Sequence, residues 1–443
     1  MTGLLPPLAR QRASRLPTVA DTVLANGLRV LAVRRPGVPL VELRLRVPFA
    51  GPSGRAGDAH VARASLLGDT LLMGTDRRTA SQLAVDVQAL GGQLSASTDA
   101  DRLAVAGSVL TTGLAGLLEL LAEVLTSATY PKAEVGGERD RLVQELAIHR
   151  SNAGVVAREA LLARMYAGHP YGVDLPTSEA VAAVRPRDLR ALHASRVAPA
   201  GSVLTLVGDL SPARVTALVE RTLEAWTSSS TAASTPPVPA QVGRTALLLH
   251  RPGAVQTTIR LGGAAPSRTH PDSAALSLAN LVFGGYFSSR WVANIREDKG
   301  YTYSPHSGID HPPAGSRFVA GADVATGVSA PALVETLYEL GRIATVPVRQ
   351  EELDQARRYA IGTLALGTAT QAGLAGTLSQ LAAAGLSVGW LRDHPAALER
   401  VTVEDVLAAG LRWLAPARLT PVLVGDADVV ADSLRGIVEV ERA

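Results

Sequence analysis

Few residues of this chain of 443 are suited to covalent or metal chemistry. Cysteine is absent, which excludes disulfide scaffolds, zinc-thiolate and iron–sulfur sites, and cysteine nucleophiles. Among the nine histidines the only close pair is His306 and His311, five apart with Asp310 between them. The segment around this pair is typical of a strand and a turn, so we expect no metal site there. The sequence also lacks a P-loop and a dinucleotide-binding fingerprint.

Two other spacings suit chemistry, although each has a plain structural explanation. Glu138 and Glu145 lie seven apart on a predicted helix, and from spacing alone a solvated helix face explains them. His60 heads an apolar helical stripe with Ala64 and Leu67, which is typical of a packed or capping histidine. Spacing alone therefore defines no active site.

The elements that would position these residues follow one plan in the first half of the chain. We expect strands at 28–33, 40–47, 93–98, 103–108 and 204–207, and helices at about 60–73, 80–90 and 112–196, the last broken near Pro131, Asn152 and Pro170. Hairpin strands followed by runs of helices predict an α+β fold with an antiparallel or mixed sheet.

The second half repeats this plan at an offset of 217 residues. The offset carries Val203–Asp209 onto Thr420–Asp426, residues 27–33 onto 244–250, and residues 39–47 onto 256–264. A Ser-, Thr- and Pro-rich linker at 227–243 separates the halves. We expect two homologous domains, 1–226 and 244–443, each a sheet covered by helices on one face.

Composition excludes several kinds of partner. The net charge is only +3 and the basic residues are scattered, so no surface for nucleic acid is expected. The uncharged stretch 359–391 is rich in Gly, Ala, Thr and Ser, which suits closely packed helices better than a membrane span. No secretory signal is evident near the N-terminus. We expect a cytoplasmic protein without membrane contact.

Three runs carry a resemblance to a known family. They are Gly27-Leu-Arg-Val30, then His169-Pro-Tyr171 before Val207-Gly-Asp209, and, most specific, Phe287-Ser-Ser-Arg290 with Ile295-Arg-Glu-Asp-Lys-Gly-Tyr-Thr-Tyr-Ser304. Over nearly the whole chain after residue 20 the sequence resembles the pitrilysin/insulinase (inverzincin) zinc metallopeptidases, in their mitochondrial-processing-peptidase-like branch. The resemblance implies a LuxS/mitochondrial-processing-peptidase-like fold that forms half of a clamshell.

The resemblance also implies where zinc would bind. Active members use an inverted H-x-x-E-H helix motif, whose Glu is the general base, and a Glu from a later helix. The matching stretch here is His60-Val-Ala-Arg-Ala64, so Arg63 replaces the base and Ala64 the second histidine. Glu145 resembles the third ligand and Glu138 its companion. We expect no zinc in this chain, and hypothesise that Arg63 occupies the vacated site and pairs with Glu145 or Glu138.

The second half keeps a pair that the family uses on substrate. Arg296 and Tyr303 match an Arg that grips substrate carbonyls and a Tyr that donates to the oxyanion. The plainer alternative is a surface pair of Arg296 with Glu297 or Asp298, and a strand aromatic at Tyr303.

Two further segments match substrate-handling parts of the family. The N-A-x-T signature of the edge strand that receives the peptide is Ser95-Ala-Ser-Thr98 here, so its Asn is lost. Gly284-Gly285 is expected to cap a helix, the alternative being a loop that gates a peptide chamber.

Together these matches predict the non-catalytic, substrate-binding subunit of a heterodimeric zinc endopeptidase that cleaves peptides or leader sequences in an enclosed chamber. The partner would be a homologous catalytic subunit with an intact H-x-x-E-H motif and the Zn²⁺ ion. One alternative is a purely structural or peptide-binding homologue, like the core subunits of respiratory complexes. Another is an autonomous enzyme with a rearranged metal site that uses His60 and Glu145.

Overall fold

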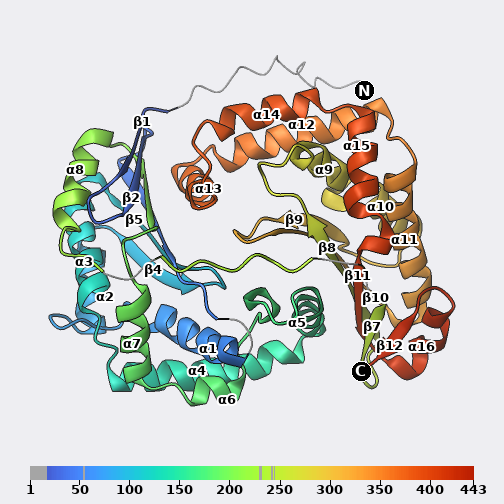
Figure 1. The fold of residues 1–443 in the computed structure, drawn as a ribbon, viewed down its shortest axis with the longest axis horizontal. Helices are drawn as coiled ribbons and strands as arrows, with labels where there is room; N and C mark the ends of the chain where they lie inside the picture. Colours follow the sequence, from blue (N-terminus) through green and yellow to red (C-terminus); the bar gives the residue numbers. More distant parts are fainter. Residues whose placement is uncertain (1–16, 53–54, 229–231, 241–242, 244) are drawn as a thin grey trace, which may run out of the picture.

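The computed structural model describes residues 17–52, 55–228, 232–240, 243 and 245–443. Two six-stranded sheets, each with helices on its outer side, lie next to each other (Figure 1). The described part of the segment 227–243 contains no helix or strand, as expected of a linker.

The first sheet has the strand order β1-β2-β6-β3-β5-β4. Its strands are β1 (Val19–Val23), β2 (Arg29–Arg34), β3 (Leu40–Pro48), β4 (Gln93–Thr98), β5 (Arg102–Leu110) and β6 (Val203–Gly208). Only β2 and β6 run parallel, so the sheet is mixed. Along β3, Val41, Leu43 and Leu45 are buried in the core of the first half, and the polar residues between them lie on the opposite face.

The helices of the first half lie close to the predicted ranges, except that α1 begins five residues before the predicted start at residue 60 and ends three before residue 73. They are α1 (Arg55–Thr70), α2 (Ala80–Ala89), α3 (Leu114–Ser127), α4 (Lys132–Ser151), α5 (Ala153–Met165), α6 (Ser178–Ala182), α7 (Pro186–Arg196) and α8 (Pro212–Thr222). Pro131 stands directly before α4, and Asn152 caps α5 by accepting from the amides of Gly154 and Val155. The expected breaks at Pro131 and Asn152 are therefore confirmed.

The second sheet has the order β12-β7-β11-β8-β10-β9 and repeats five strands of the first. The outer strand differs, because β12 pairs parallel to β7, whereas β1 pairs antiparallel to β2. Its strands are β7 (Ala246–His250), β8 (Gln256–Ala265), β9 (His306–Asp310), β10 (Ser316–Ala325), β11 (Thr420–Gly425) and β12 (Val440–Arg442). Strand β11 follows β6 by 217 residues, the offset of the sequence repeat, and both strands are buried along their whole length. The expected α+β class with two homologous sheets is confirmed.

The helices of the second half continue the correspondence. They are α9 (Ser273–Asn280), α10 (Arg290–Val292), α11 (Ser329–Thr345), α12 (Gln350–Gly367), α13 (Gln371–Ala383), α14 (Trp390–Arg400), α15 (Val403–Ala409) and α16 (Ala427–Arg435). Turns of π-helix extend α9, α10 and α15 at Leu281–Gly285, Ala293–Asp298 and Gly410–Leu414. The uncharged stretch 359–391 spans the end of α12, all of α13 and the start of α14. Within the described ranges, no helix has the length and apolarity that crossing a membrane requires.

One helix of each half packs against the sheet of the other half. Helix α13 buries Leu378 against Val207 and its neighbours on the first sheet. Helix α5 buries Leu161 against Val422 and its neighbours on the second sheet. Each sheet is thus covered by the helices of its own half on one face, as the sequence predicts, and partly by an exchanged helix on the other, which no periodicity indicates (Figure 1).

Candidate functional site

A cluster of charged residues joins α1 to α4 at the place where the family resemblance puts a metal. The Arg141 side chain donates from Nε to Glu138 at 2.6 Å and from Nη1 to Glu145 at 2.5 Å. Its Nη2 lies 3.8 Å from a carboxylate oxygen of Asp69 on α1. Burial raises the pKa of Asp69, the Arg141 guanidinium lowers it, and the charges of Glu138 and Glu145 raise it.

The hypothesis that Arg63 replaces the metal is wrong. Arg63 is half-buried on α1, and its Nε donates to the carbonyl of Ala59 one turn earlier, at 2.9 Å. In the described part of the chain, Glu138 and Glu145 form their ion pairs with Arg141. Arg141 lies three residues after Glu138 and four before Glu145, so all three side chains share one helix face.

His60 does not face this cluster. Its ring is buried, and Nε2 donates to the Phe49 carbonyl at 3.0 Å. Burial, the largest effect, lowers the pKa of His60. A Cβ at Gly51 would lie 2.3 Å from the His60 ring, so the backbone there packs directly on the imidazole. His60 is the packed histidine of the plainer explanation, and the ligand pair His60 and Glu145 is not formed.

The α1 residue that meets the α4 carboxylates is Asp69, five positions beyond Ala64. Two ligands at i and i+4 on this helix face would therefore fall on Ser65 and Asp69, with Gly68 at the place of the base. A Cβ at Gly68 would lie 3.3 Å from the backbone of Thr98, so this position packs closely against β4. On this register both histidines and the base are absent.

Zinc does not fit these residues. A catalytic zinc site uses three protein ligands with nitrogen or carboxylate donors and an open position. Here three carboxylates share a guanidinium, and no histidine joins them in the described residues. The positive charge that the carboxylates need is supplied by Arg141, so no catalytic step through a metal is derived for this chain.

Arg296 and Tyr303 lie together at the surface of the second half. The Arg296 guanidinium carbon is 4.8 Å from the Tyr303 ring centre and 4.5 Å from that of Phe287. Tyr303 is 80% exposed and Phe287 60% exposed, so the stack can be reached from outside. Nε of Arg296 also pairs with Glu297 at 3.2 Å, the contact of the plainer alternative. Arg296 and Tyr303 are thus accessible at the surface, and their contacts fit both the substrate-binding role and the plainer alternative.

Strand β4 is the free edge of the first sheet and holds Ser95 to Thr98. Its side chains are exposed on one face and half-buried on the other, and its other edge pairs with β5. The segment therefore has the edge position that peptide addition requires, without the Asn of the family signature.

The His169-Pro-Tyr171 run fastens the linker and the second half to the first half. The Tyr171 hydroxyl donates to Asp101 at 2.9 Å and accepts from the amide of Ala314 at 2.9 Å. His169 Nε2 donates to the carbonyl of Pro236 in the linker at 2.8 Å. Through these hydrogen bonds the run links segments that are far apart in the sequence.

The remaining sequence candidates also have structural roles. His311 accepts or donates at Nδ1 with the Ser316 hydroxyl at 2.8 Å, and burial lowers its pKa to about 4. Gly284 lies in the π-helical turn after α9, where a Cβ would be 2.8 Å from the Trp291 ring. The expected glycine cap is not formed, because Gly284 and Gly285 end the π-helical turn itself, Tyr286 is its C-cap, and neither glycine has a positive φ. Gly284 instead allows close packing against Trp291.

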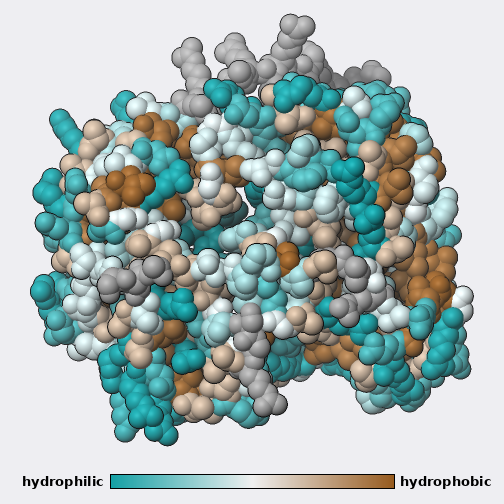
Figure 2. All heavy atoms as spheres, viewed as in Figure 1, coloured by the Kyte–Doolittle hydropathy of each residue, from teal (hydrophilic) through white to brown (hydrophobic). Residues whose placement is uncertain are grey.

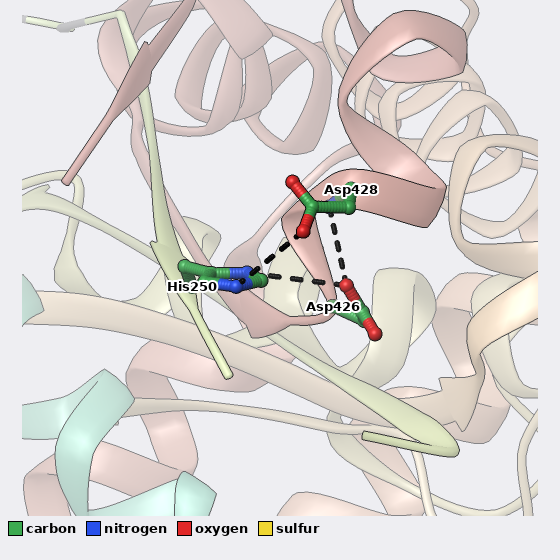
Figure 3. A group of neighbouring side chains, drawn as sticks. All are labelled: His250, Asp426 and Asp428. Atoms are coloured by element: carbon green, nitrogen blue, oxygen red, sulfur yellow. Dashed lines mark hydrogen bonds and ion pairs between the residues drawn. The ribbon is translucent and has the colours of Figure 1, made fainter. Parts of the chain in front are cut away.

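A group with metal-ligand chemistry that the sequence did not single out is His250, Asp426 and Asp428 (Figure 3). Nδ1 of His250 already accepts from the amide of Ala427 at 3.1 Å. Asp426 caps α16, and Asp428 pairs with Arg442 at 2.7 Å. These side chains form hydrogen bonds and ion pairs with each other, with Arg442 and with the first amides of α16. The group is therefore a helix-capping arrangement.

A G-x-S-x-G pattern occurs at Gly385-Leu-Ser-Val-Gly389. In serine hydrolases this pattern forms a sharp turn between a strand and a helix. Here it connects α13 to α14, two helices, so it lacks the geometry of a nucleophile elbow.

Comparison with known proteins agrees with the fold. The family model described as Insulinase (Peptidase family M16) matches residues 62–177, beginning after His60, and that of the Peptidase M16 inactive domain matches residues 183–359. An uncharacterised zinc protease of Mycobacterium leprae is 30% identical over 309 residues, 68% of each chain. The zinc protease YmxG of Bacillus subtilis is 23% identical over 346 residues, 77% of this chain and 82% of the relative.

Two solved structures have the same fold. A peptidase M16 inactive domain from Pseudomonas fluorescens has a TM-score of 0.84 and 25% identity, covering 92% of this chain and 98% of that one. A protease from Helicobacter pylori has a TM-score of 0.83 and 20% identity, covering 93% and 100%. The chain belongs to the insulinase family of peptidases, family M16. The predicted family is confirmed.

Proposed function

We propose that this chain is the non-catalytic, substrate-binding subunit of a heterodimeric zinc endopeptidase. In this proposal a homologous partner with an intact H-x-x-E-H motif holds Zn²⁺, and the two chains enclose peptides or leader sequences in the cytoplasm. Arg296 and Tyr303 would complete the partner's active site, with Arg296 binding substrate carbonyls and Tyr303 donating to the oxyanion.

One contrast carries the proposal. The metal position of the first half holds the salt-bridged Arg141, whereas the second half presents Arg296 and Tyr303 in an accessible stack. Two exposed aromatic rings, those of Phe287 and Tyr303, lie against the one guanidinium of Arg296. This accessible grouping of aromatic and charged side chains supports contact with a ligand.

The direct test is reconstitution with a zinc-competent homologue and a fluorogenic peptide. We expect the mixture to hydrolyse the peptide and a chelator to abolish hydrolysis. Arg296→Ala and Tyr303→Phe should each lower kcat/KM by about 10²-fold, the usual cost of losing one oxyanion donor or substrate clamp. Arg63→Ala is the matched control and should leave turnover intact, because the Arg63 guanidinium donates to the Ala59 carbonyl of its own helix.

Gel filtration of each mixture shows that the variants still bind the partner. Full activity of both the Arg296 and the Tyr303 variants would favour the purely structural homologue instead. Chelator-sensitive hydrolysis by the isolated chain would exclude the non-catalytic role.

A further inference from the structure

A cavity of about 710 Å³ lies between the two halves. The first half contributes the start of α1 and the turn between β4 and β5, and the second half contributes Arg268 and the segment 309–313. Helix α13 closes one side with Gln380 and Ala384. The surface is hollowed near the middle of the molecule, between the halves (Figure 2). We call this space the central cavity; Arg296, Tyr303 and the Asp69–Arg141 cluster do not line it.

Three arginines of the central cavity form no close ion pair with a carboxylate within the described ranges, although Asp99 attracts Arg46 and Asp101 attracts Arg102 from farther away. They are Arg46 on β3, Arg102 on β5, and Arg268 in the loop after β8. Arg46 donates only to the hydroxyl of Ser379, at 2.7 Å. Nε of Arg102 is buried without an acceptor. Arg268 stacks over Trp390, 5.4 Å from the ring centre.

The two arginines of the first half lie side by side. In the β3–β5 register Arg102 is opposite Pro48, and Arg46 precedes Pro48 by two residues on the same face. Arg46 and Arg102 are therefore diagonal neighbours on the sheet face that borders the cavity. Burial and the charge of Arg102 lower the pKa of Arg46 to about 10, consistent with a guanidinium whose positive charge is poorly compensated.

The four carboxylates that line the same cavity already have partners. Asp310 pairs with Arg317 at 3.0 Å and Asp174 with Arg158 at 2.7 Å. Asp101 accepts from Tyr171 and Thr235, and Asp99 accepts from the amides of Asp101 and Arg102 at 2.8 Å. The carboxylates are thus held by other donors, and the guanidinium groups of Arg46, Arg102 and Arg268 remain for a ligand.

We propose that the central cavity binds a short acidic peptide, one carboxylate lying between Arg46 and Arg102 and a second against Arg268 on the wall of the other half. Guanidinium groups bind carboxylates through charge-assisted hydrogen bonds, which are the strongest type available here. The volume is within the range of small-molecule ligand sites, and a ligand with two carboxylates can use the arginines of both walls. This site is separate from the proposed catalytic partnership and needs no partner chain.

The test is isothermal titration of the full chain with the tripeptide Glu-Glu-Glu at low ionic strength, where charge interactions are least screened. Gln-Gln-Gln is the uncharged comparison, and inorganic phosphate tests a simple oxyanion. We expect binding of Glu-Glu-Glu and none of Gln-Gln-Gln. Arg46→Gln and Arg268→Gln should each weaken binding by about 10-fold or more, since each removes a hydrogen bond to a charged group.

Arg214→Gln is the matched control, because it makes the same charge change on the exposed face of α8. The thermal unfolding temperature of Arg268→Gln should equal that of the wild type or exceed it, since a half-buried guanidinium that is not paired with a carboxylate lowers the stability of the fold. The proposal would be overturned if Glu-Glu-Glu did not bind, or if both cavity variants bound it with the affinity of the wild type. It would also be overturned if Arg214→Gln weakened binding as much as the cavity variants do. Phosphate that binds as tightly as Glu-Glu-Glu would show an oxyanion site and refute the peptide.

Discussion

Arg141 supplies, from a neighbouring position on the same helix, the positive charge that a metal supplies in active relatives. Its two ion pairs with Glu138 and Glu145 are intrahelical, and its reach to Asp69 spans two helices. The cluster is partly exposed, so its contribution to stability is modest. Its electrostatic effect is specific, since its positive charge favours the ionised form of a half-buried carboxylate on α1 and so opposes the rise in the pKa of Asp69 that burial causes.

Arg141→Ala tests this effect through pH. The pKa of Asp69 is higher in the folded chain than in the unfolded chain, so its ionisation costs stability above its folded pKa, and the cost disappears as pH falls below it. Arg141 opposes this rise, so its removal enlarges the cost. Denaturant unfolding should show a loss of up to about 1 kcal/mol at pH 8 that shrinks near pH 4. Arg139→Ala, on the same helix, should show no such dependence, and an equal loss at both pH values would contradict the assignment.

Ser289 allows a second test with single residues. Its hydroxyl is buried and has no hydrogen-bond partner among the described residues, whereas the buried hydroxyl of Ser202 donates to the Ala198 carbonyl at 2.6 Å. An unpaired buried polar group costs free energy and a paired one stabilises. Ser289→Ala should therefore raise the free energy of unfolding or leave it unchanged, and Ser202→Ala should lower it by about 1 kcal/mol. The opposite order in chemical denaturation would contradict the structure.

The spacing of Glu138, Arg141 and Glu145 was present in the sequence, and the i, i+3 and i, i+4 rule would have paired them. The expectation of Arg63 came instead from aligning the H-x-x-E-H motif on the only nearby histidine, His60. A histidine is a strong sequence signal, but packing against Phe49 and Gly51 explains it here. Which turn of α1 faces α4 is a matter of helix crossing, which the sequence alone does not determine.

Between elements, the pair of Arg290 and Glu352 joins α10 to α12. Two parallel bonds of 2.8 Å link the side chains, which are 8% and 16% exposed. The hydrogen bond from Arg290 is the main cause that lowers the pKa of Glu352 to about 2. The pair holds the segment that precedes Arg296 against the helix layer.

Glu352→Gln should lower the free energy of unfolding by about 3 kcal/mol at pH 7, because it leaves the Arg290 charge buried. A depressed carboxyl pKa stabilises the fold above the ordinary glutamate pKa, and this stabilisation is lost as pH falls toward about 2. The difference between wild type and variant should therefore narrow in denaturation experiments below about pH 4. Glu351→Gln, at the exposed neighbouring position, should match wild type at every pH.

Helix positions were predicted well because their limits are local. Pro131 and Asn152 act on the backbone and amides beside them, whatever the rest of the fold does. The π-helical turns and the destination of α5 and α13 were not predicted. An apolar stripe indicates that a face is buried, but it does not identify the sheet that covers it.

At the scale of the whole molecule, the exchanged helices make each half depend on the other. Leu378→Ala in α13 should cost about 2–5 kcal/mol, the usual loss for a buried leucine. The damage should appear as faster amide hydrogen exchange in β2 and β6 of the first sheet, although the substitution lies in the second half. Leu340→Ala in α11, whose side chain is buried in the core of its own half, is the control. If Leu378→Ala increased amide hydrogen exchange only in the second sheet, the packing of α13 on the first sheet would be contradicted.

The repeat of 217 residues predicted two equivalent sheets, and the strand order bears this out. The boundaries at 226 and 244 remain predictions about separate domains, and the reciprocal packing of α5 and α13 means that a cut there would remove a helix from each sheet. Sequence similarity between halves reveals duplication, while the assignment of elements to folding units depends on packing.

The same reciprocity bears on how such a chain can change over time. The half that has lost its metal ligands still provides Leu161 and the rest of α5 to complete its sister sheet. Mutations could therefore erase the old chemistry of this half freely, but deleting the half would expose the other to solvent. The first half is therefore needed as a covering layer for the second sheet, independently of any chemistry of its own.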